Sequence, residues 1–226
     1  MFKGALPLIA LFFANLIYSI NYGVAKDVMA EGYLQAFSFI LFRVVGAVFL
    51  FWVVSIFTKN EKIEKNDYLK FAICGLFGVA ANQLMFFEGL HHTSTINASI
   101  LMVTNPILVL ILATVMLKER LSIRKILGVA IGLIGAVLLI LFKANGVNEQ
   151  SSFGGDILIL LNATSYGIYL ILAKPLMSKY SPLTVVKWVF TFGLLFVLPF
   201  GVSQVGEIKW NMPSEIVLEI VYVVVF

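Results

Sequence analysis

Seven apolar runs, each about as long as a membrane is thick, divide the chain. A helix needs about 20 mostly apolar residues to cross about 30 Å of hydrocarbon. None of the runs alternates polar and apolar residues with period two, so we expect helices rather than barrel strands. They cover Leu6–Val24, Ala36–Phe57, Phe71–Leu90, Thr95–Leu117, Ile126–Phe142, Ile157–Ala173 and Pro182–Gly201.

The composition excludes the main alternatives to a membrane protein. The 226 residues are 61% hydrophobic and 12% charged, whereas soluble domains carry about 25% charged residues. Disorder is excluded by the apolar content, and a disulfide scaffold is excluded because Cys74 is the single cysteine. The basic residues lie between apolar runs, so the net charge does not indicate nucleic-acid binding. We expect an all-α, multi-pass helical bundle with the lipid bilayer around it.

The first run has an alternative interpretation as a signal peptide. Lys3 precedes it, and Gly23-Val24-Ala25 resembles a small-x-small cleavage site. The apolar stretch is longer than the 7–15 residues of a typical signal peptide. We therefore expect a retained first helix.

The distribution of Lys and Arg predicts the orientation in the membrane, because short cytoplasmic loops are enriched in these residues. With the N-terminus inside, eleven of the cations fall on the cytoplasmic side and three fall outside. The remaining two, Arg43 and Lys187, lie within spans. The sequence thus predicts a protein of the cytoplasmic (inner) cell membrane with a cytoplasmic N-terminus.

Two predicted spans carry matching polar stripes at i, i+3, i+4 and i+7, which is one helix face. The stripes are Asn15, Tyr18, Ser19 and Tyr22 in span one, and Asn162, Ser165, Tyr166 and Tyr169 in span six. Five spans form an odd number, so a repeated five-helix unit would enter the membrane inverted, as in many secondary transporters. The stripes either line a central cavity or form hydrogen bonds between helices.

The block from Gly75 to Leu141 has more specific features. Span three contains Gly-x-x-Gly and Asn82-Gln83 and closes with Phe-Phe-Glu-Gly-Leu; a Thr-Ser turn, Pro106 in span four, Lys118-Glu119-Arg120 and a Gly-rich span five follow. Asn21-Tyr22-Gly23, Phe42-Arg43 and Lys187-Trp188-Val189-Phe190 fit the same pattern. This sequence resembles the EamA-type transporters of the drug/metabolite transporter superfamily.

The resemblance implies two inverted five-helix repeats, ten spans in all, that move small metabolites. On this basis the first repeat covers residues 5–142, an outer linker 143–154, and an incomplete second repeat 155–226. The eighth run, from Ile216 to Phe226, extends only about 16 Å and does not span. We therefore expect a truncated product, with a complete chain roughly 70 residues longer.

Charged side chains within the spans are candidate pathway residues. Arg43 lies about seven residues below the outer end of span two, and Glu88 lies near the outer end of span three. A cation at this depth costs from about 2.5 kcal/mol upward unless it faces protein or water. An outer gate and a structural ion pair are equally consistent with these two. Lys187, followed by Trp188, either lines the inner end of a pathway or extends its amine to the membrane–water interface.

Polar residues near a proline complete the set of candidates. Pro106 removes a backbone donor in span four, with Asn97 and Thr104 on one face. This suits a hinge or substrate site, or a static kink. Asn82 in span three suits a cavity or a helix contact. The expected pathway residues are Asn15, Tyr18, Tyr22, Arg43, Asn82, Glu88, Asn97, Thr104, Asn162, Tyr166, Tyr169, Lys187 and Trp188, with Pro106 as the hinge.

Enzyme motifs are missing from the sequence: it has no GxSxG, HExxH, CxxC, P-loop or GxGxxG after a strand. We expect no cofactor and no metal site. Gly128, Gly132 and Gly135 form a small-residue face for close helix packing, with a homodimer as the second alternative. The expected function is alternating-access export of a small metabolite such as an amino acid; the alternative is a non-transporting membrane scaffold or inactive fragment.

The charge bias gives a direct test of topology. In Asn60→Cys and Asn145→Cys variants, the two thiols should react from opposite sides of the membrane, because the predicted loops lie on opposite sides. The measurement is labelling of intact cells with an impermeant maleimide. Labelling at position 60 in intact cells would show that the orientation is wrong.

Overall fold

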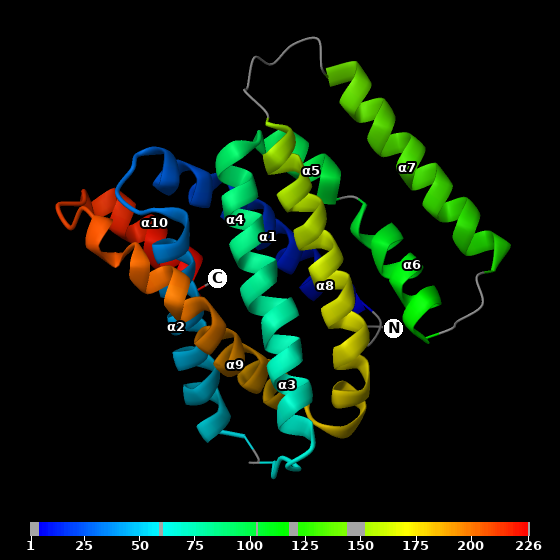
Figure 1. The fold of residues 1–226 in the computed structure, drawn as a ribbon, viewed down its shortest axis with the longest axis horizontal. Helices are drawn as coiled ribbons and strands as arrows, with labels where there is room; N and C mark the ends of the chain where they lie inside the picture. The colour runs from blue at the N-terminus through cyan, green and yellow to red at the C-terminus, as the bar shows by residue number, and fades with distance from the viewer. Residues whose placement is uncertain (1–4, 59–60, 103, 118–121, 144–151, 226) are drawn as a thin grey trace.

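The computed structural model describes residues 5–58, 61–102, 104–117, 122–143 and 152–225, and every regular element in these ranges is a helix (Figure 1). The elements are α1 Ala5–Ala30, α2 Ala36–Ile56, α3 Asp67–Gly75, the π-helical turn η2 Leu76–Ala80, α4 Ala81–His92, α5 Thr95–Met102, α6 Asn105–Leu117, α7 Ile123–Lys143, α8 Phe153–Lys179, α9 Pro182–Ser203, the short 3-10 turn η3 Val205–Glu207 and α10 Ser214–Val225.

Five of the helical segments are long and apolar enough to cross a membrane: 36–56, 67–92, 97–117, 153–179 and 182–203. They coincide with predicted spans two, three, four, six and seven. The first and fifth predicted spans are occupied by α1, with 26 residues, and α7, with 21 residues. The prediction of an all-α, membrane-spanning bundle is confirmed.

The third span is longer than predicted. It begins at Asp67 rather than Phe71 and runs through α3, η2 and α4 to His92. The predicted start was Phe71 because the charged residues before it resemble a loop. Span four breaks where Pro106 was noted: α5 ends at Met102, and α6 begins again at Asn105.

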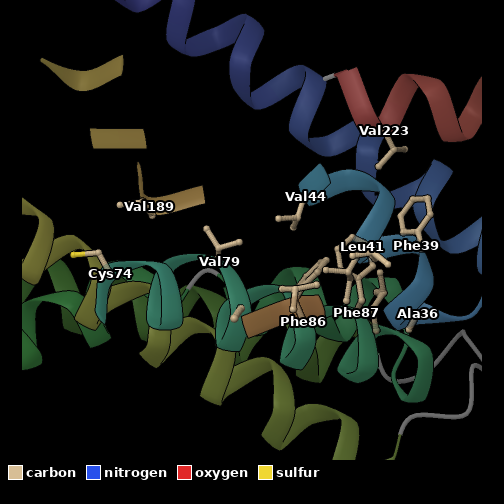
Figure 2. Packing of buried hydrophobic residues seen from close by; sticks show 14 of the residues in the cluster. Ala36, Phe39, Leu41, Val44, Cys74, Val79, Phe86, Phe87, Val189 and Val223 are labelled. Atoms are coloured by element: carbon tan, nitrogen blue, oxygen red, sulfur yellow. The ribbon is translucent and has the colours of Figure 1, made fainter. Parts of the chain in front are cut away.

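Contacts between the two halves of the chain hold the bundle together. α2 packs along α9, and α3, η2 and α4 pack against α8 and α9, while α10 packs against α1 and α2 (Figure 1). The buried apolar cluster lies in these contacts. Figure 2 shows Leu41, Phe86 and Phe87 between α2 and α4, and Val223 of α10 beside Phe39 and Val44.

Two glycines permit close helix crossings. Gly46 of α2 lies against the side chain of Val224 in α10. Gly193 of α9 lies against Val79 in η2, and a Cβ at Gly193 would come within 2.5 Å of the Val79 Cβ. In each case the second span of one half receives a valine from the third span of the other half.

The loops between spans also contact each other at both ends of the bundle. We call the ends inner and outer, because the charge bias predicts that they face the cytoplasm and the outside. At the inner end, the Glu64 backbone N–H donates to the Tyr180 hydroxyl at 3.2 Å. At the outer end, Lys209 N donates to Tyr33 O at 3.1 Å, and Phe37 N donates to Gln204 Oε1 at 2.9 Å.

The predicted glycine face of α7 is not covered by the described residues. A Cβ added at Gly128, Gly132 or Gly135 would meet nothing within 4 Å. Within the described part of the chain, α7 has its main contact with α5 and stands apart from the other helices (Figure 1). Packing or dimerisation through this face stays a prediction.

The crossing at Gly193 gives a test with a matched control. Gly193→Ala should lower the free energy of unfolding by about 1–3 kcal/mol, because the added methyl overpacks against Val79. Gly132→Ala adds the same methyl to an open helix face and should be neutral or stabilising, since alanine favours helix over glycine. Thermal unfolding of the purified protein in detergent compares the two. Equal stability of both variants would show that the crossing tolerates a side chain.

Candidate functional site

The polar stripe on α8 contacts the third span at the middle of the bundle. Asn162 is 1% exposed, and its Nδ2 donates to the backbone oxygen of Asn82 at 2.6 Å. Asn82 Nδ2 in turn donates to the backbone oxygen of Asn162 at 3.4 Å. Two amides thus hold α4 and α8 together by reciprocal hydrogen bonds between side chain and backbone.

The π-helical turn in the third span receives the next residue of the stripe. A π-turn shifts the backbone hydrogen-bond register by one residue and is frequent at functional sites. Ser165 Oγ donates to the backbone oxygen of Phe77 within this turn at 2.7 Å. Asn162 and Ser165 therefore both form hydrogen bonds between helices, which is one of the two roles that the sequence predicted for the stripe.

The tyrosines of the stripe lie differently from one another. Tyr169 is half-buried and packs its ring onto Gly78, where an added Cβ would come within 2.5 Å of Tyr169 Cδ2. Tyr166 is 37% exposed, with its ring centroid 5.9 Å from that of Tyr169. Asn15, Tyr18 and Tyr22 lie in α1, but their side chains are outside the described residues.

Lys187 does not extend to the interface. Its side chain is buried, and Nζ lies 4.4 Å from the ring centroid of Trp52. The Trp52 indole donates to Thr191 Oγ1 at 3.0 Å, which fixes the ring under the amine. Trp188 packs edge-on against Trp52 and Tyr68. The ammonium is therefore held at the α2–α9 contact by a cation–π interaction.

The two outer charges have separate neighbours. Glu88 Oε1 lies 3.1 Å from His92 Nε2, one turn further along α4. The Arg43 guanidinium lies over the ring of Phe87, with Cζ 5.8 Å from the centroid. The structure thus places Arg43 and Glu88 on neighbouring parts of the α2–α4 contact, and a gate at this position stays a prediction.

The break in span four places its polar residues in turns. The Asn97 backbone N–H donates to Ser94 Oγ at 3.0 Å, which caps the start of α5. Thr104 Oγ1 donates to Leu101 O at 2.5 Å, and its carbonyl accepts the Ile107 and Leu108 N–H groups at 3.0 Å. Pro106 stands in the first turn of α6, where its missing N–H costs no helix bond. The hinge role of Pro106 is untested.

An ionic cluster at the inner end was not predicted from the sequence. Residues 58–70 were expected to form a solvated linker, but Asp67 is 2% exposed. Its carboxylate accepts from Lys70 Nζ at 2.7 Å, Lys179 Nζ at 2.6 Å and the Tyr180 hydroxyl at 2.8 Å. The interpretation as a solvated linker is wrong for this residue, because donors from two elements compensate its burial. The Asp67–Lys70 spacing of i, i+3 was the available signal.

A second acid extends the inner contact. Glu61 Oε2 accepts from the backbone N–H of Ser181 at 3.0 Å and from its hydroxyl at 2.9 Å, and Ser181 is the residue that caps the start of α9. Hydrogen bonds from Thr184 and Ser181 hold the pKa of Glu61 below its ordinary value of 4.5, and the positive charge of Lys187 acts in the same direction. The loop before α3 and the first residue of α3 are thus joined to the α8–α9 turn by three carboxylates, those of Glu61, Glu64 and Asp67.

A comparison with known families matches residues 5–141 and 153–226 to the model of the EamA-like transporter family. The chain belongs to the EamA-like transporter family. EamA-like proteins are transporters, not enzymes, so this is a multi-pass membrane protein of a transporter family, as the sequence predicted.

Individual relatives of this EamA-like chain are known at moderate identity. It is 29% identical over 163 residues to the uncharacterized transporter YyaM of Bacillus subtilis, covering 70% of this chain and 52% of that one. It is 29% identical over 133 residues to a protein named probable terminal-alkyne amino-acid exporter of Streptantibioticus cattleyicolor, covering 59% and 43%. The chain thus aligns with about half the length of these relatives.

The fold of this EamA-like protein also occurs in a solved structure. A crystal structure superimposes with a TM-score of 0.60 at 16% identity, covering 93% of this chain and 78% of the other. At this identity the likeness concerns the fold alone.

The Asp67 cluster gives a stability test. Asp67→Asn removes the charge that Lys70 and Lys179 share, so the midpoint of thermal unfolding should fall, because the two cations lose their common carboxylate. Asp27→Asn, at an exposed carboxylate of α1, is the control and should change stability by less than about 0.5 kcal/mol. Thermal unfolding in detergent measures both. An unchanged midpoint for Asp67→Asn would show that the cluster contributes nothing to the folded state.

Proposed function

We propose that this protein is a secondary transporter that exports a small metabolite, with amino acids as the first candidates, by alternating access. The family supports transport, and the amino-acid candidate rests on the name of one relative at 29% identity. The observation that carries the proposal is the match of residues 5–141 and 153–226 to a family of transporters. The partly exposed ring of Tyr166, on the same stripe as Asn162 and Ser165, supports a pathway beside α8, since polar residues within spans often mark substrate pathways in transporters.

We propose further that the two halves are inverted repeats of a ten-span architecture, with 5–142 and 155–226 as its units. The paired glycine crossings at Gly46 and Gly193 support this. The loop contacts support it as well: the loop after span one meets the loop after span seven outside, and the loop after span two meets the turn after span six inside. In an inverted repeat, span one corresponds to span six and span two to span seven. The outer loop contact then corresponds to the inner loop contact.

We propose that the protein lies in the cytoplasmic membrane with its N-terminus in the cytoplasm. In this orientation the Asp67 cluster with Lys70 and Lys179 faces the cytoplasm. The distribution of cations in the sequence supports the same orientation. The alternative function, a non-transporting scaffold or inactive fragment, predicts no flux.

A flux assay tests the proposal. The protein is reconstituted in liposomes, and counterflow of radiolabelled L-leucine, L-phenylalanine and L-propargylglycine is measured. Tyr166→Ala and Tyr18→Ala should reduce flux roughly tenfold, a loss of about 1.4 kcal/mol, if their rings line the pathway. Leu161→Ala, at a neighbouring exposed position of α8, should leave flux unchanged.

The outcomes separate the two functions. No flux of any of the three substrates, with the protein inserted and folded, would support the scaffold. Normal flux in the tyrosine variants together with lower detergent stability would show that the stripes only pack helices.

A further inference from the structure

A buried lysine of α9 has no acid in contact with it. Lys187 is 5% exposed, and within the described part of the chain its Nζ forms no hydrogen bond and no ion pair. Its partner is the ring of Trp52, whose centroid lies 4.4 Å from Nζ. A desolvated cation–π interaction contributes about 2 kcal/mol, whereas removing an ammonium from water costs several kcal/mol. Part of the cost of burying this charge is therefore not offset within the described residues.

The negative charge of Glu61 acts on Lys187 only from a distance. Both oxygens of Glu61 accept from the Ser181 backbone N–H, at 3.2 and 3.0 Å, and Oε2 also accepts from the Ser181 hydroxyl at 2.9 Å. The charges of Glu61 and Lys187 interact without forming an ion pair. Glu61 thus serves the start of α9, and the amine of Lys187 remains available to another anion.

The amine is held a short distance below the inner end of the bundle. Lys187 lies five residues after the start of α9 and Trp52 four residues before the end of α2. At a rise of about 1.5 Å per residue, both lie about 6–8 Å from these helix ends. A lysine at this depth ordinarily extends its amine to the interface. Trp52 holds it back, because its indole is fixed by Thr191 at 3.0 Å and its ring packs edge-on against Trp188.

Aromatic rings around Lys187 reach the surface of the bundle. Trp52 is 41% and Tyr68 is 36% exposed, and the ring of Tyr68 lies 5.2 Å from that of Trp188. These residues come from three elements, and Figure 1 shows α9 between α2 and α3, both of which it contacts. Tryptophan and tyrosine are enriched where helices meet lipid headgroups. We call Trp52, Tyr68, Lys187 and Trp188 the inner aromatic site.

We propose that the inner aromatic site binds an anionic phospholipid, with the headgroup phosphate against Lys187 and the rings of Trp52 and Tyr68 against the start of the acyl chains. A cation held inside hydrocarbon is compensated by extension to the interface or by headgroups drawn towards it, and Trp52 blocks the first route. In the proposed orientation this end faces the leaflet that carries anionic lipid. The proposal rests on that orientation for the leaflet and does not depend on transport.

The proposed ten-span architecture leaves this surface open to lipid. Span four, made of α5 and α6, packs on α8, which is span six. The inverted repeat places span nine on span one in the same way. Among the described elements α1 has its main contacts with α10, α4 and α5, and α9 is not one of them. Span nine therefore packs away from the inner aromatic site, and a lipid is the occupant that remains.

A lipid-binding experiment tests this without any transport. Thermal unfolding of the purified, delipidated protein in a nonionic detergent is measured with phosphatidylglycerol, phosphatidylcholine or soluble glycerol phosphate at equal concentration. Phosphatidylglycerol should raise the midpoint by a few degrees when it exceeds its Kd about tenfold. Phosphatidylcholine has the same tails without net charge, and glycerol phosphate has the anion without tails. Neither should give a comparable shift.

Variants assign the shift to the inner aromatic site. Lys187→Met removes the charge at similar length and should reduce the phosphatidylglycerol shift to less than half. Without lipid it should be at least as stable as the wild type, because a buried charge is removed. Trp52→Leu removes the ring that holds the amine, and it gives a second reading of the site if Lys187→Met does not fold. Lys65→Met, at an exposed cation of the same inner end, is the control and should keep the full shift.

Three results would overturn the lipid site: an equal shift with phosphatidylcholine or glycerol phosphate, an undiminished phosphatidylglycerol shift in both Lys187→Met and Trp52→Leu, or no shift with any probe. A shift that Lys65→Met reduces as much as Lys187→Met would overturn it as well, since binding would then follow the overall charge of the inner end. A phosphatidylglycerol shift in a protein that shows no counterflow would support the lipid site and contradict the transport function.

Discussion

The absence of water in the hydrocarbon core is the constraint on which the rest of the structure depends. Every polar group that enters the bundle must find its partner in the protein, because an unsatisfied group costs several kcal/mol there. The reciprocal amides of Asn82 and Asn162, and the bond from Ser165 to the π-turn, are direct consequences. They fix the rotation of α8 against the third span, and this rotation determines which residues face the interior.

The same constraint explains why much of the fold could be predicted. Long apolar runs have one stable conformation in a bilayer, so helices 36–56 and 182–203 were predicted almost to the residue. The polar stripe on α8 was predicted because polar residues on one helix face are rare in such runs. Its partner helix was not predictable, since a stripe specifies a face and says nothing about what packs on it.

Two residues show where sequence reasoning reached its limit. Lys187 could extend to the interface by its length, but the placement of Trp52 on α2 holds the amine inside. Asp67 sits among lysines and looks solvated, but the α8–α9 turn brings Lys179 and Tyr180 onto it from over a hundred positions away. Both depend on tertiary contacts between elements distant in the chain, which local composition does not encode.

The loop contacts at the two ends of the bundle differ in chemistry, and this gives the ends different responses to the solution around them. The outer contact is made by Tyr33, Phe37, Gln204 and Lys209 through backbone and amide hydrogen bonds, with Phe37 packed edge-on against Phe200. The inner contact is ionic, and its Glu64–Lys179 pair is largely exposed. Dissolved ions screen exposed charges within about 10 Å at 0.1 M and leave neutral hydrogen bonds almost untouched. A rise in salt therefore weakens the inner contact relative to the outer contact, so that the stability of the two ends depends differently on the ionic strength of the medium.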